Sequence, residues 1–367
     1  MGIKRNILLN PGPATTSDSV KLAQVVPDIC PREKEFGEVM EFVSKELTNF
    51  VGDNREYTTV LFGGSGTAAV EAMISSTIDN GKVIIINNGA YGKRMCEIAE
   101  AYELDFIEFK SSPIEAISLS ELEETIKLSG KKITHIAMIH HETTTGLLND
   151  VKSVGNLCSK YDIDLIVDAM SSFAGMPIDM KEMNIKYLAS SSNKCIQGMA
   201  GVSFVIANLE SLLKTREIKP RNLYLNLYKQ YEYFKDNYQM RFTPPVQVLY
   251  ALKQAIIEAK SETIEKRYIR YTKSCDILLN GLKELGLEKI VSEENHSKLI
   301  TSVIEPSYEK YNFDDMHRYF YDRGFTIYPG KVSNLNTFRI ANIGDIYPED
   351  MKNFVELMKE YIEGIKK

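Results

Sequence analysis

The chain of 367 residues contains no tryptophan, few cysteines and no surplus of positive charge. Its five cysteines, Cys30, Cys96, Cys158, Cys195 and Cys275, are scattered and form no CxxC pair. This spacing excludes a disulfide framework and a cysteine zinc site, and it is typical of reduced thiols in a cytoplasmic protein. The net charge of −6 excludes a basic surface that would attract nucleic acid or an anionic membrane.

Long hydrophobic runs are missing as well. No apolar segment approaches the length of a membrane span, and residues 1–17 hold no apolar core long enough for a signal peptide. We therefore expect a cytoplasmic protein. The composition, with 44% hydrophobic and 26% charged residues, is that of a globular protein, and the length allows a large core and roughly two domains.

Strand-like and helix-like segments alternate regularly between residues 58 and 207. The strand-like runs are continuously apolar, as strands covered on both faces require. This alternation predicts an α/β fold with a mostly parallel central sheet and helices on both faces. Toward the C-terminus the order of elements changes and predicts a small α+β domain. We expect a large domain at 26–275 and a small domain formed by 1–25 and 276–367.

The region between these parts is rich in aromatic residues and then strongly helical. The aromatic residues are Tyr224, Tyr228, Tyr231, Tyr233, Phe234 and Tyr238. They indicate either a surface that a partner or substrate buries, or an aromatic cluster under a long loop. Residues 246–285 predict one long amphipathic helix with a bend at 268–272.

Five short polar clusters each follow a predicted strand. They are GGSGT (63–67), NNGAY (87–91), HHETTTG (140–146), DAMSS (168–172) and SSSNK (190–194). Since the carboxyl ends of parallel strands lie at one edge of a sheet, we expect these clusters to converge on a single binding site.

Two of these clusters carry a pair of residues with specific chemistry. Asp168 ends a strand, residues 163–167, that is too apolar for the surface, and Lys194 follows a serine-rich turn. A buried lysine has a lowered pKa and reacts with carbonyl groups, and a buried carboxylate is the partner that a pyridine-ring cofactor needs at its nitrogen. The alternative is a buried salt bridge between Asp168 and Lys194.

The GGSGT cluster lies between a predicted strand and a helix. Its backbone N–H groups and the hydroxyl groups of Ser65 and Thr67 suit a phosphate, but a tight turn would also require the glycines. Tyr91 opens the following helix, where it would stack on a flat ring or simply belong to the core or rim.

The sequence offers one candidate for binding an acid group and none for a metal. Arg339 lies inside the predicted strand 338–341; facing the large domain it would be a two-pronged anion clamp, and facing outward a surface arginine. His140 and His141 do not make a metal site, because neighbouring strand residues point to opposite faces and no partner follows at ligand spacing.

Together these stretches resemble the class V aminotransferases, pyridoxal-phosphate enzymes of fold type I. The resemblance covers essentially the whole chain, in order. It is carried by LLNPGPATTS (8–17), HETTTGLLN (141–149), SSNKCIQG (191–198), RFTPPVQVL (241–249) and FRIANIG (338–344). Within the family these strings are most similar to enzymes that convert 2-aminoethylphosphonate and pyruvate to phosphonoacetaldehyde and alanine. Residues 26–37 look more like biosynthetic forms, so the reverse direction is equally open.

The resemblance implies a role for each matching residue. Lys194 would hold pyridoxal 5′-phosphate covalently and carry the proton between substrate and cofactor, and Asp168 would pair with the ring nitrogen. The cofactor phosphate would lie against Ser65, Gly66 and Thr67.

Further roles follow from the same resemblance. Tyr91 would stack on the cofactor ring and Thr144 would bond near its phenolic oxygen. Thr243 would reach the phosphate of the neighbouring subunit's cofactor, which implies a homodimer with shared sites. Arg339 would bind the acid group of the substrate, with Arg32 as a second contact.

Other functions are open at this point. Another class V aminotransferase, such as an alanine–glyoxylate enzyme, would share most of these residues. A cysteine desulfurase needs a mobile, reactive thiol, whereas Cys195 adjoins Lys194 and would be fixed by the same turn. A non-enzymatic interaction protein would be expected to have lost some of the cofactor residues, and all of them are present.

Overall fold

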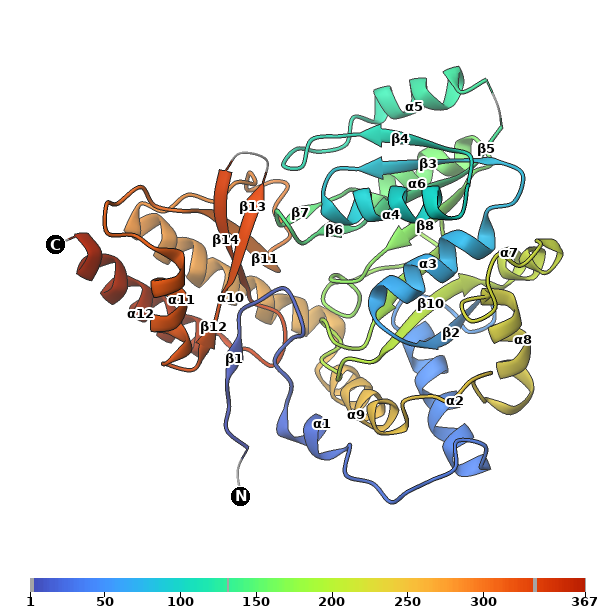
Figure 1. Ribbon diagram of the computed structural model, residues 1–367, viewed down its shortest axis with the longest axis horizontal. Helices are drawn as coiled ribbons and strands as arrows, with labels where there is room; N and C mark the ends of the chain where they lie inside the picture. The colour runs from blue at the N-terminus through green and yellow to red at the C-terminus, as the bar shows by residue number, and fades with distance from the viewer. Residues whose placement is uncertain (1–2, 131, 333–334, 367) are drawn as a thin grey trace.

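The computed structural model describes residues 3–130, 132–332 and 335–366 of the chain (Figure 1). Its centre is a seven-stranded sheet in the spatial order β2-β10-β9-β8-β5-β3-β4. The strands are β2 (Tyr57–Gly63), β10 (Val202–Asn208), β9 (Ile185–Ser191), β8 (Asp164–Asp168), β5 (Ile133–Ile139), β3 (Lys82–Asn87) and β4 (Phe106–Lys110). Strand β10 runs antiparallel to both neighbours, while the other adjacent pairs are parallel. The predicted mostly parallel sheet is therefore confirmed.

Helices cover both faces of this sheet, as the sequence predicts (Figure 1). One face packs against α2 (Lys34–Asn49), α5 (Leu119–Leu128), α6 (Val151–Lys160) and α9 (Val246–Glu262). The other packs against α3 (Gly66–Thr77), α4 (Ala90–Ala101), α7 (Leu209–Lys214) and the start of α8 (Leu227–Asn237). A 3₁₀ turn, Thr215–Glu217, follows α7.

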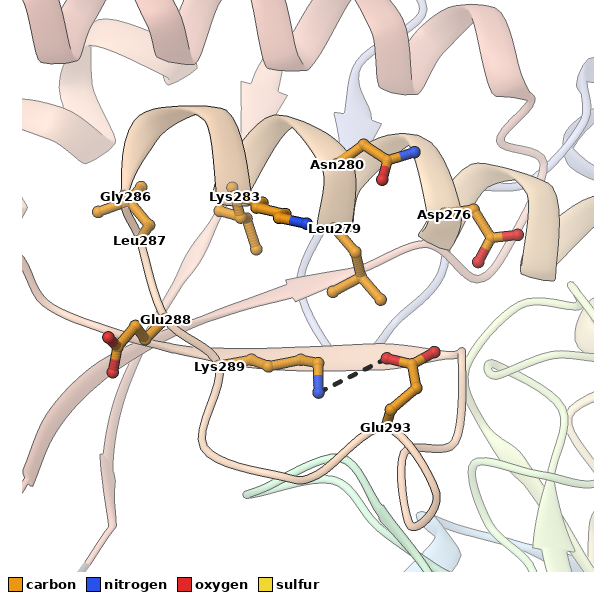
Figure 2. A pocket seen from close by; sticks show the side chains of 10 residues that line it. Asp276, Leu279, Asn280, Lys283, Gly286, Leu287, Glu288, Lys289 and Glu293 are labelled. Atoms are coloured by element: carbon orange, nitrogen blue, oxygen red, sulfur yellow. Dashed lines mark ion pairs between the residues drawn. The ribbon is translucent and has the colours of Figure 1, made fainter.

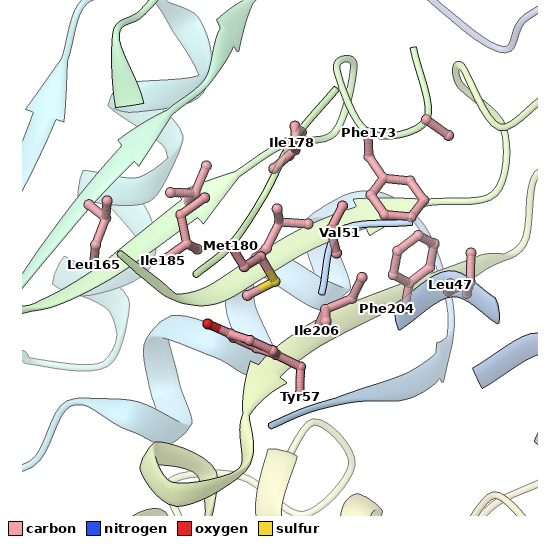
Figure 3. Close-up of a cluster of buried hydrophobic side chains, with 14 of the residues drawn as sticks. Leu47, Val51, Tyr57, Leu165, Phe173, Ile178, Met180, Ile185, Phe204 and Ile206 are labelled. Atoms are coloured by element: carbon pink, nitrogen blue, oxygen red, sulfur yellow. The ribbon is translucent and has the colours of Figure 1, made fainter. Parts of the chain in front are cut away.

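Figure 3 shows part of the first of these cores, where side chains from α2 and the sheet meet. The rings of Phe173 and Phe204 lie edge to face with their centroids 5.1 Å apart. Aromatic pairs in this geometry add about 0.5–1.5 kcal/mol to the free energy gained by burying their surface. Phe173 follows Asp168 closely in the chain, so this core also supports the segment that leaves the end of β8.

The C-terminal part has its own sheet and core. An antiparallel sheet, β11-β14-β13, and a two-stranded pair, β1-β12, pack with three helices. These elements are β1 (Ile7–Leu8), α10 (Ile264–Leu285), β11 (Ile300–Ile304), α11 (Phe313–Tyr321), β12 (Phe325–Thr326), β13 (Tyr328–Val332), β14 (Leu335–Ala341) and α12 (Pro348–Lys366). Their buried side chains form one cluster that joins Ile7 and Leu9 to residues from Leu278 onward.

This cluster supports the small domain expected from the sequence, but the boundaries stay a prediction. The boundary at residue 275 lies inside α10, which continues through it. The short helix α1 (Asp18–Leu22), expected to belong to the small domain, packs through Val20 against Ala251 and Ala255 of α9 in the large part.

The single long helix predicted at 246–285 is wrong. The chain forms two helices, α9 and α10, which are separated at Thr263, where φ is 68°. The Thr263 hydroxyl accepts the Lys266 N–H and so caps the start of α10. The predicted bend at 268–272 is continuous helix.

The order of the strands decides where a ligand can bind. From β3 the chain first moves outward to β4 and then returns to the other side of β3 to form β5, β8 and β9. The direction of winding therefore reverses between β3 and β5. In open α/β sheets this reversal leaves a crevice at the carboxyl ends of the strands, where ligands bind.

Among the described residues, no helix has the length and apolar composition that crossing a membrane requires.

Candidate active site

A cavity of about 230 Å³ lies at the carboxyl edge of the large sheet. Its lining draws on all five polar clusters: Ser65, Gly66 and Thr67; Tyr91; His141 and Thr143; Asp168, Met170 and Ser171; Ser191, Asn193 and Lys194. Val70, Arg94, Ile139, Ala200 and Gly201 complete it. The convergence that the sequence predicts is therefore observed.

Asp168 is the last residue of β8 and is held between two neighbouring strands. Its parallel pairing with Ile139 of β5 and Ala189 of β9 fixes its place at the sheet edge. The side chain is buried, and its Oδ1 accepts the Met170 N–H at 2.8 Å. Burial raises the pKa of Asp168 to about 6, although this hydrogen bond and the charge of Lys194 both favour the carboxylate.

Lys194 reaches the same cavity from the turn after β9. Its side chain is half-buried, and Nζ donates a hydrogen bond to the carbonyl oxygen of Pro11 at 2.7 Å. Burial lowers the pKa of Lys194 from its ordinary value. A lowered pKa increases the neutral fraction of the amine, which is the form that attacks a carbonyl group.

Asp168 and Lys194 share a cavity but do not pair. Among the described residues no ion pair joins them, since Lys194 donates to Pro11 and Asp168 accepts from Met170. The salt-bridge alternative for these two residues is therefore wrong. Two groups of opposite charge that face one cavity from separate anchors leave space for a ligand between them.

The start of α3 provides an anion site beside them. Ser65 is the N-cap residue, and within the described chain its hydroxyl makes no capping hydrogen bond, so it is free for a ligand. A larger residue in place of Gly66 would displace a neighbouring side chain. A Cβ on Gly66 would lie 2.3 Å from Sδ of Met170, another residue of the cavity wall.

Two further polar atoms of the lining lack a partner. Thr143 Oγ1 and His141 Nε2 are buried and make no hydrogen bond to any described residue. Burial lowers the pKa of His141 to about 3, so its ring is neutral. Buried polar groups without partners are costly, and a polar ligand in the cavity would remove that cost.

Thr144, the threonine expected near the cofactor ring, has a different environment. It does not line the cavity, and its hydroxyl donates to Glu142 Oε1 at 2.6 Å. The Glu142 carboxylate also accepts the N–H of Tyr91, at 3.3 Å, at the start of α4. The sequence placed Thr143 and His141 in a polar cluster expected at the site but assigned a specific role only to Thr144; the alternating directions of residues that leave a strand end were the available signal.

Arg339 of β14 faces the large part of the molecule. Its Nη1 approaches the carbonyl oxygen of Thr143 at 3.5 Å, and its Nη2 donates to that of Pro329 at 3.1 Å. The guanidinium lies 4.8 Å from the ring centroid of Tyr328, and its buried Nε has no partner among the described residues. Of the two orientations left open by the sequence, the structure has the one that suits an anion clamp.

Arg32 and Thr243, like Arg339, are not among the residues that line this cavity. The Arg32 guanidinium donates to the carbonyl oxygens of Met240, at 2.6 Å, and Arg241, at 3.2 Å. It thereby fixes the segment that leads to Thr243, whose side chain is exposed. A contact of Thr243 with the cofactor would have to involve a neighbouring subunit.

A second hollow, of about 730 Å³, lies between the C-terminal half of α10 and the segment 287–293 (Figure 2). It is lined by charged side chains, including Lys289 and Glu293, which pair with each other at 3.7 Å. None of the predicted site residues that the structure describes lines it. We therefore do not assign the chemistry to this hollow.

The described residues include no group of three or more His, Cys, Asp or Glu side chains placed to hold a metal ion. The five cysteines are all unpaired, and only Cys30 is exposed. Cys195 beside Lys194 is buried; its Sγ donates to the carbonyl oxygen of Ser171, and burial raises its pKa to about 12. It lacks the mobility and thiolate character that desulfurase chemistry requires.

Comparison with known proteins identifies the family. The model of the family "Aminotransferase class-V" matches residues 21–341. This chain is a class V aminotransferase.

The chain is 42% identical over 354 residues to a 2-aminoethylphosphonate–pyruvate transaminase of Bacillus cereus (strain G9842), covering 95% of this chain and 96% of that one. It is also 42% identical over 360 residues to a bifunctional phosphonoacetaldehyde hydrolase/aminoethylphosphonate transaminase of Clostridioides difficile (strain 630). That match covers 97% of this chain but spans only 56% of the bifunctional relative. An alanine–glyoxylate aminotransferase structure from Nostoc sp. superposes with a TM-score of 0.90 at 23% identity, over 100% of this chain and 97% of that one, which supports the fold alone.

The cofactor of a class V aminotransferase is pyridoxal 5′-phosphate, and the cavity of this chain fits it. A buried carboxylate, an amine of lowered pKa and an open helix N-terminus face one space, in which two buried polar atoms have no partner among the described residues. A flat ring with a basic nitrogen, an aldehyde and a phosphate needs these groups.

Asp168 provides a test of the cavity without cofactor. Its folded-state pKa, about 6, lies above the ordinary 3.8, so its contribution to stability is complete below pH 4 and is lost as the pH rises through 6. Asp168→Asn keeps the oxygen that accepts the Met170 N–H but carries no charge. We expect the cofactor-free variant to be more stable than wild type by up to about 3 kcal/mol at pH 8 and similar at pH 4. Urea unfolding at pH 4, 6 and 8 measures this, and a difference that does not vary with pH would contradict it.

Proposed function

We propose that this chain transfers the amino group between 2-aminoethylphosphonate and pyruvate, forming phosphonoacetaldehyde and alanine or running in reverse. The observation that carries the proposal is the pair Asp168 and Lys194, which face one cavity without pairing. The identity to the Bacillus cereus transaminase, 42% over nearly the full length of both chains, supports the choice of substrates.

The bound cofactor would supply a positively charged ring that withdraws electrons from the substrate carbon. Asp168 would hold the proton on the ring nitrogen, because its carboxylate is a buried acceptor in the cavity lining. Lys194 would bind the cofactor aldehyde through Nζ, and the same atom would take a proton from the substrate and return it. The start of α3 and the hydroxyl groups of Ser65 and Thr67 would bind the phosphate. Tyr91 would cover the ring from the start of α4.

Absorbance tests the proposal directly. The purified protein with cofactor should show a visible absorption band from the lysine-bound form, which 2-aminoethylphosphonate bleaches and pyruvate restores. Lys194→Ala should lose both the band and turnover, because no other described amine lines the cavity. Bleaching by alanine and recovery with glyoxylate, with no response to the phosphonate, would instead support the alanine–glyoxylate alternative. Release of sulfide from cysteine would instead support the desulfurase alternative.

Arg339 is our candidate for binding the substrate's acid group, phosphonate and carboxylate in turn. Its guanidinium is held near the cavity by Thr143 and Pro329 and keeps an unpartnered buried Nε. Burial lowers its pKa, but arginine stays charged in proteins. Arg32 would act indirectly, because its donors are used by the backbone at residues 240–241.

Arg339→Lys keeps the charge but loses the planar fork. Since a hydrogen bond to a charged group contributes about 1.5–3 kcal/mol, we expect KM to rise roughly 10- to 100-fold for both 2-aminoethylphosphonate and pyruvate. The effect on kcat should be smaller. Steady-state kinetics measures both, with Arg323→Lys, a substitution at an exposed arginine after α11, as control. A rise in KM for only one substrate would mean that Arg339 does not serve both acid groups.

A homodimer with shared sites is also part of this proposal. The exposed Thr243 lies beside exposed apolar side chains: Leu223 is 71%, Tyr224 42% and Phe242 37% exposed. Such neighbours indicate a surface that a second copy covers. Sedimentation at micromolar concentration should give twice the chain mass of 41.6 kDa. A monomer at all concentrations would contradict the shared site. The cytoplasmic location expected from the unpaired cysteines belongs to the same proposal.

A further inference from the structure

A buried arginine lies next to the turn that carries Lys194. Arg267, in the second turn of α10, is 1% exposed, and its Nη1 donates to the carbonyl oxygen of Cys195 at 2.8 Å. Cys195 directly follows Lys194 in the chain. The hydrogen bond therefore fixes the peptide plane that follows Cys195 and, with it, the path of the backbone at the catalytic turn.

The orientation of Arg267 is itself fixed. Its Nε donates to Glu262 Oε2 at 2.7 Å, across the break between α9 and α10. The same carboxylate binds a second arginine, because Arg270 Nε donates to Glu262 Oε1 at 2.6 Å. Arg270 turns in another direction and donates to the carbonyl oxygens of Gly344 and Ile346. The two arginines thus share an anchor but hold different parts of the chain.

Other contacts fix the same turn. Cys195 Sγ donates to the carbonyl oxygen of Ser171, and Gln197 Nε2 donates to the Tyr271 hydroxyl at 2.7 Å. Gln197 has a φ of 66°, an unusual value for a residue other than glycine, so this contact helps to hold a strained backbone. The Lys194 carbonyl oxygen accepts the Gln197 N–H within the turn. The turn is therefore fixed through α10 on one side and through the segment after β8 on the other.

We propose that Arg267 is a positioning residue for Lys194, acting through the carbonyl group of Cys195. The proposal rests on the proposed function, in which the Lys194 amine condenses with the aldehyde of the cofactor and releases one water. The lysine side chain is flexible, so its reach is set by the direction in which the backbone delivers it. A buried ion pair is weak evidence for a role in stability alone, since apolar residues often replace one without loss.

Two forms of the cofactor distinguish an effect on the position of Lys194 from an effect on cofactor binding. Pyridoxal 5′-phosphate bonds covalently to Lys194, whereas pyridoxine 5′-phosphate, which has an alcohol in place of the aldehyde, cannot. We expect Arg267→Lys and Arg267→Met to capture the aldehyde form about 10- to 100-fold more slowly than wild type, because small displacements of a reacting group cost rates of this order. The affinity of these variants for pyridoxine 5′-phosphate should stay within about twofold of the wild-type affinity, since the substitutions do not touch the residues that would bind the phosphate and the ring. Stopped-flow absorbance measures capture, and calorimetry measures the affinity.

Arg270→Lys is the matched control, because it uses the same Glu262 carboxylate but does not contact the lysine turn. It should capture the aldehyde form as fast as wild type. Glu262→Gln keeps Arg267 but weakens its ion pair, so its rate of aldehyde capture should lie between those of wild type and the Arg267 variants. This variant also provides a test should the Arg267 variants fail to fold. Unchanged capture in the Arg267 variants, an equal loss of affinity for both cofactor forms, or equal slowing in Arg270→Lys would each overturn the proposal. Should wild type itself bind both forms alike and without a covalent bond, the proposed function fails, whatever the role of Arg267.

Discussion

The site depends on keeping the buried Asp168 carboxyl group and the half-buried Lys194 amine apart. Asp168 and Lys194 are each costly to bury, and an ion pair would remove part of that cost. They are instead anchored separately, to the Met170 N–H and to the Pro11 carbonyl oxygen. Burial consequently outweighs their mutual attraction: it raises the pKa of the acid and lowers that of the amine. A ring placed between them would interact favourably with both groups, so the cost of burying them favours binding of the cofactor.

The fold produces this arrangement by strand register. Asp168 lies opposite Ile139 and Ala189 in a parallel sheet, so the chain beyond each strand end leaves toward the same crevice. The reversal of winding between β3 and β5 opens that crevice, and the N-terminus of α3 faces it. The helices on both faces bury the central strands, and Asp168 is buried at the end of one of them.

Much of this was predictable from local patterns, and what was missed depends on contacts between distant segments. Apolar strands followed by polar clusters predicted the sheet, its parallel direction and the place of the site. The break at Thr263 was missed because helical periodicity continues through it, although a threonine before a charged turn is an available capping signal. Thr143, rather than Thr144, lines the cavity, because Glu142 binds the Thr144 hydroxyl. No sequence pattern indicated Arg267 or the Pro11 carbonyl, whose partners lie 72 and 183 residues away.

The N-terminal segment links Lys194 to the strand that carries Arg339. The Leu9 carbonyl oxygen accepts the Ala341 N–H at 2.7 Å, which joins this segment to the end of the strand that carries Arg339. Two residues later, Pro11 accepts the Lys194 amine. Gly12 allows this approach, because a Cβ there would lie 2.2 Å from the lysine Nζ. One main-chain hydrogen bond and one hydrogen bond from the lysine side chain therefore connect Lys194 to the strand that carries Arg339, through residues 9–11. This segment couples the position of the amine to that of the strand.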